Sequence, residues 1–159
     1  MSSIRLELYY PNLRQTGYKI TSSNTASYNC IAWAAGATDR PWWPIEEKPY
    51  YWPLSPRIES LESFIDAFQS LGYRICGNGD LEIGCEKVAI YTDEEGEPTH
   101  MARQLDTGEW TSKCGDLEDI THTLDGLEGD YYGQVSTFMK RPIEKKREYD
   151  GNLVAEDIY

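Results

Sequence analysis

The sequence has no apolar run long enough to span a membrane, and its first residues show no secretion signal. The N-terminus reads MSSIRLELYYPNLRQ, without the charged segment followed by an apolar segment that a signal peptide needs. Both absences favour a cytoplasmic protein, and we expect no membrane partner.

Basic residues are also scarce. Fifteen Lys and Arg stand against 27 Asp and Glu, which gives a net charge of −12, and no Lys/Arg-rich patch appears before the C-terminal tail. Such a chain repels the phosphates of nucleic acids. We therefore expect no nucleic-acid partner, and instead a peptide or protein substrate or partner that is basic or neutral.

Cysteine and histidine are too few and too dispersed for a typical zinc site. There is no CxxC pair, and the chain has two histidines. We expect reduced thiols, no bound metal and no cofactor. The cysteines are Cys30, Cys76, Cys85 and Cys114.

The chain does contain enough apolar material for one folded domain. Apolar residues make up 40% of it, with five Trp and twelve Tyr among its 159 residues. We expect a single domain over residues 1–141, followed by a charged and loosely held tail over 142–159.

Hydrophobic periodicity predicts an α+β fold. A short helix is expected to begin at Asn29, a good N-cap, and to stop at Gly36, and an amphipathic helix is expected over 57–71. Because strands follow these helices, the prediction is N-terminal helices packed on a small antiparallel sheet. The other expected elements are an extended arm and loop over residues 1–28, strands over 73–76, 87–91, 99–105, 109–113 and 131–141, and a helix with an acidic first turn over 116–127.

A proline-rich aromatic segment, DRPWWPIEEKPYYWPLSP, occupies residues 39–56. Proline at this density excludes a regular helix or a central strand. The segment either packs over the core or presents Trp42 and Trp43 as one wall of a substrate-binding site. Of these two, packing is the commoner role of aromatic side chains.

Cys30 lies at the start of a predicted helix, where backbone N–H groups and the helix dipole favour a thiolate. A thiolate nucleophile needs an imidazole that takes its proton and later returns it to the leaving group. His122 falls inside the predicted helix over 116–127, where we expect it to face solvent. His100 opens a predicted strand, so we expect it to be the general base for Cys30. Each residue alone is also compatible with a purely structural role.

The segments YNCIAWAAG, KVAIY, PTHMARQL and WTSK resemble the papain-like cysteine hydrolase superfamily in its compact form, as in NlpC/P60 and CHAP domains. The chain also resembles bacterial proteins that share NCIAWA, WWP and THxARQ elements. The resemblance covers residues 24–141. It implies a papain-like fold and a hydrolase that cleaves an amide, isopeptide or thioester bond through a Cys30 acyl-enzyme, with His100 as general base. Papain has an oxyanion-hole glutamine six residues before its cysteine, and Asn24 stands at that position here.

Turn chemistry suggests a third catalytic residue. Asp106-Thr107-Gly108 suits a three-residue hairpin loop, which pairs Leu105 with Glu109 and sets His100 opposite Cys114. Ser112 and Asp116 then become diagonal neighbours of His100. We choose Asp116 because its charge would stabilise an imidazolium, with Ser112, Glu118 and Asp119 as alternatives. Asp116 is equally suited to cap the helix expected after it.

A second function remains open for the same sequence. A domain that resembles the hydrolases but is catalytically inert would use its acidic surface to bind a basic protein partner. The two hypotheses differ in whether Cys30 and His100 meet.

Overall fold

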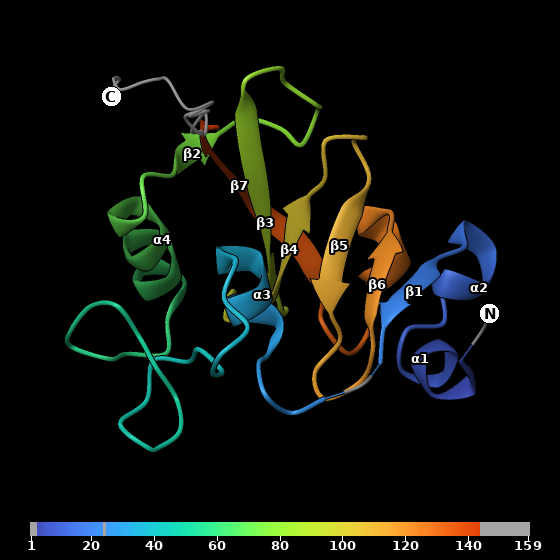
Figure 1. Ribbon diagram of the computed structural model, residues 1–159, viewed down its shortest axis with the longest axis horizontal. Coiled ribbons are helices and arrows are strands. Elements are labelled where there is room, and N and C mark those ends of the chain that lie inside the picture. The colour runs from blue at the N-terminus through green and yellow to red at the C-terminus, as the bar shows by residue number, and fades with distance from the viewer. Residues whose placement is uncertain (1–2, 24, 144–159) are drawn as a thin grey trace, which may run out of the picture.

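The computed structural model describes residues 3–23 and 25–143 (Figure 1). One seven-stranded sheet dominates it, with the strand order β1-β6-β5-β4-β3-β7-β2 and antiparallel pairing between neighbouring strands. The strands are β1 (Lys19–Ser22), β2 (Arg74–Cys76), β3 (Cys85–Thr92), β4 (Pro98–Gln104), β5 (Trp110–Lys113), β6 (Asp119–His122) and β7 (Gln134–Pro142).

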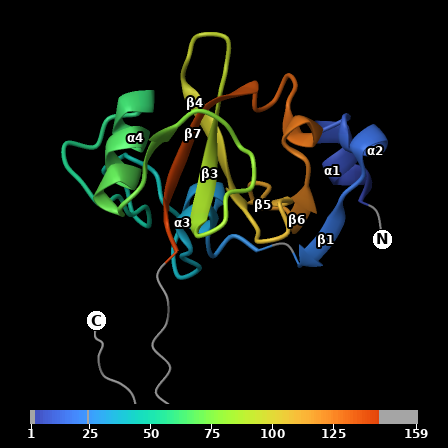
Figure 2. The same cartoon turned by 90° about the horizontal axis from the view of Figure 1, so that it is seen from above.

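Short helices lie around this sheet. Figure 2 shows α4 beyond one end of the sheet and α1 with α2 beyond the other, while α3 packs near the middle. None of the helices in the described part of the chain is long and apolar enough to cross a membrane. The helices are α1 (Ile4–Tyr9), α2 (Leu13–Thr16), α3 (Cys30–Ala35), α4 (Leu61–Ser70) and the 3-10 helix η1 (Leu124–Leu127).

The core is divided between the two faces of the sheet, because side chains alternate along each strand. On β4, Met101 points to the face covered by α3 and α4, which we call the α3 face. Ala102 points to the opposite face, which is covered by α1, α2 and η1 and is called the α1 face. Residues that pair across neighbouring strands share a face, so Ile90 lies with Met101 and Tyr91 lies with His100.

The predicted fold, N-terminal helices of the papain-like type packed on a small antiparallel sheet, is wrong. Strand accounts for 31% of the residues and helix for 21%, so the sheet is the dominant element. Two errors account for the difference. The expected extended arm before residue 28 contains strand β1 as well as α1 and α2. The expected helix over 116–127 is replaced by a turn, strand β6 and η1, so the sheet gains β1 and β6.

The turn that replaces this helix has a specific cause. Lys113 is fully buried, and its Nζ donates to the carbonyls of Gly115 and Leu117, both at 2.6 Å. A helix would need those carbonyls for its own N–H groups. Gly115 also has a φ of +61°, which is left-handed. The ammonium group of Lys113 therefore stabilises a reversal of the chain, and β6 pairs back onto β5.

Other local predictions are confirmed. Helix α3 begins at Cys30, the side chain of Asn29 accepts from Ala32 N–H, and Gly36 closes the helix with a φ of +87°. Helix α4 lies inside the predicted 57–71 range and is capped by Ser60. The hairpin register is also correct, since Leu105 N–H donates to Glu109 O at 2.7 Å. Strand β7 extends to Pro142, and the rest of the predicted tail, 144–159, lies outside the described residues.

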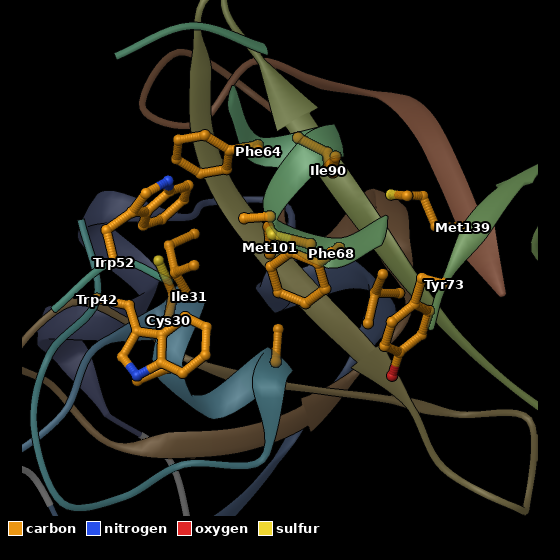
Figure 3. Close-up of a cluster of buried hydrophobic side chains, with 14 residues drawn as sticks. Cys30, Ile31, Trp42, Trp52, Phe64, Phe68, Tyr73, Ile90, Met101 and Met139 are labelled. Atoms are coloured by element: carbon orange, nitrogen blue, oxygen red, sulfur yellow. The ribbon is translucent and has the colours of Figure 1, made fainter. Parts of the chain in front are cut away.

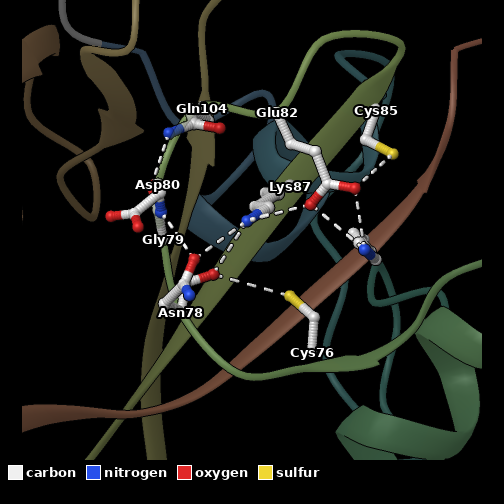
Figure 4. A network of polar contacts seen from close by, with 9 residues as sticks. Cys76, Asn78, Gly79, Asp80, Glu82, Cys85, Lys87 and Gln104 are labelled. Atoms are coloured by element: carbon white, nitrogen blue, oxygen red, sulfur yellow. Dashed lines mark hydrogen bonds and ion pairs between the residues drawn. The ribbon is translucent and has the colours of Figure 1, made fainter.

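Residues 77–84 form a strap that leaves the end of β2 and crosses the α1 face before β3 begins. Figure 4 shows the nearly buried Lys87 beneath it: Nζ donates to the backbone and side-chain oxygens of Asn78, at 3.0 and 3.3 Å. Gln104 Nε2 donates to Gly79 O at 2.7 Å. A Cβ on Gly79 would lie 2.7 Å from the ring of Phe138, so only glycine allows this close approach.

Candidate functional site

Cys30 is buried at the first position of α3, with 7% of its surface exposed. The backbone N–H groups of Met101, Ile31 and Cys30 itself favour a thiolate, as expected for a helix start. Burial outweighs them and raises the pKa of the thiol to about 11. At neutral pH the Cys30 thiol is therefore protonated, which corrects the expectation of a thiolate.

Cys30 and the side chain of His100 lie on opposite faces of the sheet. Cys30 packs against β4 from one face, and His100, a residue of β4, points to the other. Cys30 packs with Ile90 and Met101 on the α3 face. His100 points to the α1 face, where its ring stacks on Tyr132 with centroids 3.9 Å apart. The only hydrogen-bond partner of the fully buried His100 ring among the described residues is Ser112, so the expected contact with Cys30 is not formed.

His100 belongs instead to a buried chain of hydrogen bonds with fixed direction. His122 Nδ1 lies 2.6 Å from Thr123 O, and a carbonyl only accepts, so Nδ1 carries the hydrogen. In the neutral ring Nε2 is then an acceptor, and it takes the hydroxyl hydrogen of Ser112 at 2.7 Å. The Ser112 oxygen in turn accepts from His100 Nε2–H at 3.0 Å.

This chain leaves the Nδ1 lone pair of His100 without a partner in the described part of the molecule. Neutrality of both rings is enforced by burial. Burial and the nearby His122 lower the pKa of His100 well below its usual range. Burial also lowers the pKa of His122 to about 4, against the opposing effect of the Thr123 carbonyl. Both imidazoles are therefore uncharged at pH 7.

Asp116 does not reach His100. It lies exposed in the turn before β6 and has no hydrogen bond to either histidine among the described residues. The predicted register placed Ser112 and Asp116 on equal terms, but the turn tied down by Lys113 carries Asp116 away from the strand. Ser112, named as the alternative, holds the position next to the ring.

Asn24, the expected oxyanion donor, lies outside the described residues. Asp119 Oδ2 accepts from the hydroxyls of Ser22 and Tyr28. Asp119 is 1% exposed and stands opposite Lys113 in the β5–β6 pair. This alternative third residue therefore orders the approach to α3 and does not touch His100.

Trp42 and Trp43 belong to a segment that covers Cys30. Figure 3 shows Trp42 beside Cys30 and Ile31 on the α3 face, and Trp42 is 8% exposed. Asn29 fastens this segment, because its amide accepts from Trp42 N–H and donates to Trp42 O. Trp43 packs edge-to-face on Phe64. This geometry is that of core packing, and neither tryptophan lines any of the larger cavities described below.

A wide cleft lies on the α1 face, away from Cys30. It has a volume of about 720 Å³ and lies between the β4–β5 turn, the start of η1 and β7. Its lining includes Trp110, Phe138 and His122. Three carboxylates also line it, those of Glu109, Asp125 and Glu128.

Sequence reasoning missed His122 and this cleft for one reason. His122 was expected on the exposed side of a helix, but in β6 its ring is 4% exposed. The run Ile120-Thr121-His122-Thr123 carries the signal that could have found it, because three of its four residues are β-branched and favour a strand. The acidic residues before it suggested a helix start instead.

A family model described as "Domain of unknown function (DUF7689)" matches residues 19–140. Neither a curated protein nor a solved structure matches the chain. Since the family carries no assigned function, the match neither supports nor opposes the resemblance to papain-like hydrolases.

Proposed function

Because the chain belongs to the DUF7689 family, whose function is unknown, we propose a function from geometry alone: it is a binding domain for a basic protein partner. The observation that carries this proposal is the cleft on the α1 face, whose lining combines three acidic residues with aromatic and aliphatic ones. The Cys30 thiol has no part in the proposed binding.

The chemistry of the cleft matches a cationic side chain with an apolar stem. Apolar residues in the lining, among them the half-buried Phe138 and Val135, offer surface on which the methylene groups of lysine or arginine can pack. Glu109 and Asp125 are exposed at the rim, where their charges attract a cation without the large desolvation penalty of a buried pair. The net charge of −12 adds long-range attraction for a basic partner.

A fluorescent peptide of alternating lysine and threonine tests this function by anisotropy in about 0.15 M salt, where distant charges are screened. We expect binding that weakens about tenfold in the double variant Glu109→Gln/Asp125→Asn, as for the loss of one or two charge contacts worth about 1.4 kcal/mol together. The matched control is Glu46→Gln/Glu47→Gln, which removes the same charge from exposed positions of the aromatic segment.

The two variants separate a site from a general charge effect. Equal weakening in both would mean that the peptide responds only to net charge. A wild-type protein that does not bind the peptide would overturn the proposed function.

One observation favours cysteine hydrolysis as a second candidate. The hydrogen-bond chain gives His100 the tautomer that a thiol base needs, with Nε2–H held by Ser112 and the Nδ1 lone pair free. The thiol of Cys30 lies beside Met101 N–H, one residue along β4 from His100. Hydrolysis through these groups requires a rearrangement that exposes Cys30 and brings both side chains to one face. The alkylation experiment in the Discussion tests this candidate.

A further inference from the structure

We propose that the partner binds as an extended strand that displaces the Glu128 carboxylate and adds to the outer edge of β7 over residues 134–137, which no described strand covers. This inference rests on the proposed function and names its binding mode. Strand addition at a sheet edge supplies affinity through main-chain hydrogen bonds and leaves side chains to provide specificity.

The edge is free because β2 ends early. On its outer side β7 pairs with β2 only through Phe138, Met139 and Lys140. On its inner side it pairs with β3 from Pro142 back to Gln134. After Cys76 the chain turns away into the strap over residues 77–84, held by Lys87 and Gln104. No described strand therefore lies against residues 134–137 on the outer side.

A carboxylate accepts a hydrogen bond from a main-chain N–H at this edge. Glu128 Oε2 accepts from Val135 N–H at 3.1 Å. The pairing with β3 shifts register between Ile90 and Tyr91, opposite the same part of β7, so the edge is locally irregular. Glu128 thus takes the place that a carbonyl oxygen of an added strand would fill.

Two cavities border this edge. Val135 lines the acidic cleft and also a second cavity of about 550 Å³, which Gln134 and Ser136 border as well. Because both cavities reach Val135, side chains of an added strand beside this residue can enter either of them. The second cavity is also acidic, with Asp93, Glu94 and Asp130 in its lining, so it favours a basic side chain as the first cleft does.

The edge is protected by its β-bulge and by the Glu128 carboxylate on Val135 N–H, which an added strand would displace, and not by charged or proline residues of the strand itself. Exposed edges are commonly blocked by charged residues, especially lysine, or by proline. The outer strand β1 begins with Lys19, in keeping with this rule. Gln134, Val135, Ser136 and Thr137 include neither a charge nor a proline.

Amide hydrogen exchange with the lysine–threonine peptide tests the proposal. We expect bound peptide to slow exchange at residues 134–137 and to leave the matched edge at 19–22 unchanged. Val135→Pro, which removes the N–H, should weaken binding at least tenfold, and Val135→Thr, which keeps the N–H in a β-branched residue, should retain clearly more binding than Val135→Pro does. A thermal melt of Val135→Pro shows whether this variant is folded. The hydrogen-exchange experiment uses the wild-type protein, so it tests the proposal even if the variant does not fold.

The outcomes distinguish this inference from the function on which it rests. Binding without protection at residues 134–137 would overturn strand addition and leave the acidic cleft as the site. Absence of binding would overturn the proposed function itself. Concentration-dependent protection of 134–137 without peptide would show that a second copy of the chain occupies the edge, which would contradict a basic partner as its occupant.

Discussion

At the scale of single residues, the centre of the sheet holds several ionisable groups in their neutral forms. Burial raises the pKa of Cys30 to about 11 and also raises that of Cys114. Burial also lowers the pKa values of His100 and His122, so both imidazoles are uncharged at neutral pH. Neutral buried groups need fewer compensating partners than charged ones, which explains how a polar chain fits inside an apolar core.

The protonated state of Cys30 leads to a prediction about alkylation. At pH 7 we expect iodoacetamide to modify the partly exposed Cys76 and Cys85 at least ten times faster than Cys30, because the thiolate is the reactive form and Cys30 is buried. Cys114 is the matched buried control. Peptide mapping by mass spectrometry measures each rate.

The opposite order would support hydrolysis. If Cys30 reacts first, and His100→Ala removes that preference without unfolding the protein, then the two side chains cooperate in solution and the second candidate function gains its main evidence.

At the scale of elements, Asn29 joins α3 to the aromatic segment. Its side chain caps Ala32 N–H and also bonds both main-chain groups of Trp42. The cap was predictable, because it depends on residues adjacent in sequence. The bonds to Trp42 were not, because they depend on how a loop of many residues returns to the helix.

Asn29→Ala should therefore destabilise the protein more than the loss of a cap alone. We expect about 2–4 kcal/mol, since the cap and two main-chain groups of Trp42 lose their partner. Ser60→Ala, which removes the cap of α4, is the control and should cost about 1 kcal/mol. Urea unfolding measures both, and equal losses would show that the Trp42 bonds add nothing.

The candidate site shows why local patterns were not sufficient. The hairpin at residues 106–108 gave the correct register, and with it Ser112 as a neighbour of His100. That register does not decide which face of β4 meets α3, and this choice separates Cys30 from His100. The error at β6 arose because the acidic residues of this segment indicated a helix start more strongly than the β-branched residues Ile120 and Thr121 indicated a strand. The buried Lys113 favours the strand, because it binds a carbonyl that a helix would need.

At the scale of the whole molecule, the neutral core confines stability to a window of pH. The unfolded chain protonates its histidines near pH 6.5, whereas folded His122 takes a proton only near pH 4. Between these values the unfolded state binds more protons, so stability falls as the pH decreases. Above about pH 9 the unfolded chain loses the Cys30 proton first, and stability falls as the pH rises towards 11.

We therefore expect maximum stability between about pH 7 and 8.5. Below pH 6.5 the loss attributable to His122 should approach about 3 kcal/mol at pH 4, since each unit of pKa shift is worth about 1.4 kcal/mol. Urea unfolding across pH measures the profile, and His122→Asn should flatten its acid limb. An acid limb that is unchanged in the variant would mean that other groups produce it.

The place of β7 in the sheet has a consequence for the order in which the protein is made. The chain emerges from the ribosome N-terminus first, and β7 is the last of the described strands to appear, yet it lies between β3 and β2. Until residue 142 has been synthesised, β2 has no strand to pair with and β3 lacks its neighbour along its full length. A nascent chain that stalls before β7 therefore exposes the apolar strand β3. The pairing of β7 with β3 is the step that protects the newly made domain from aggregation.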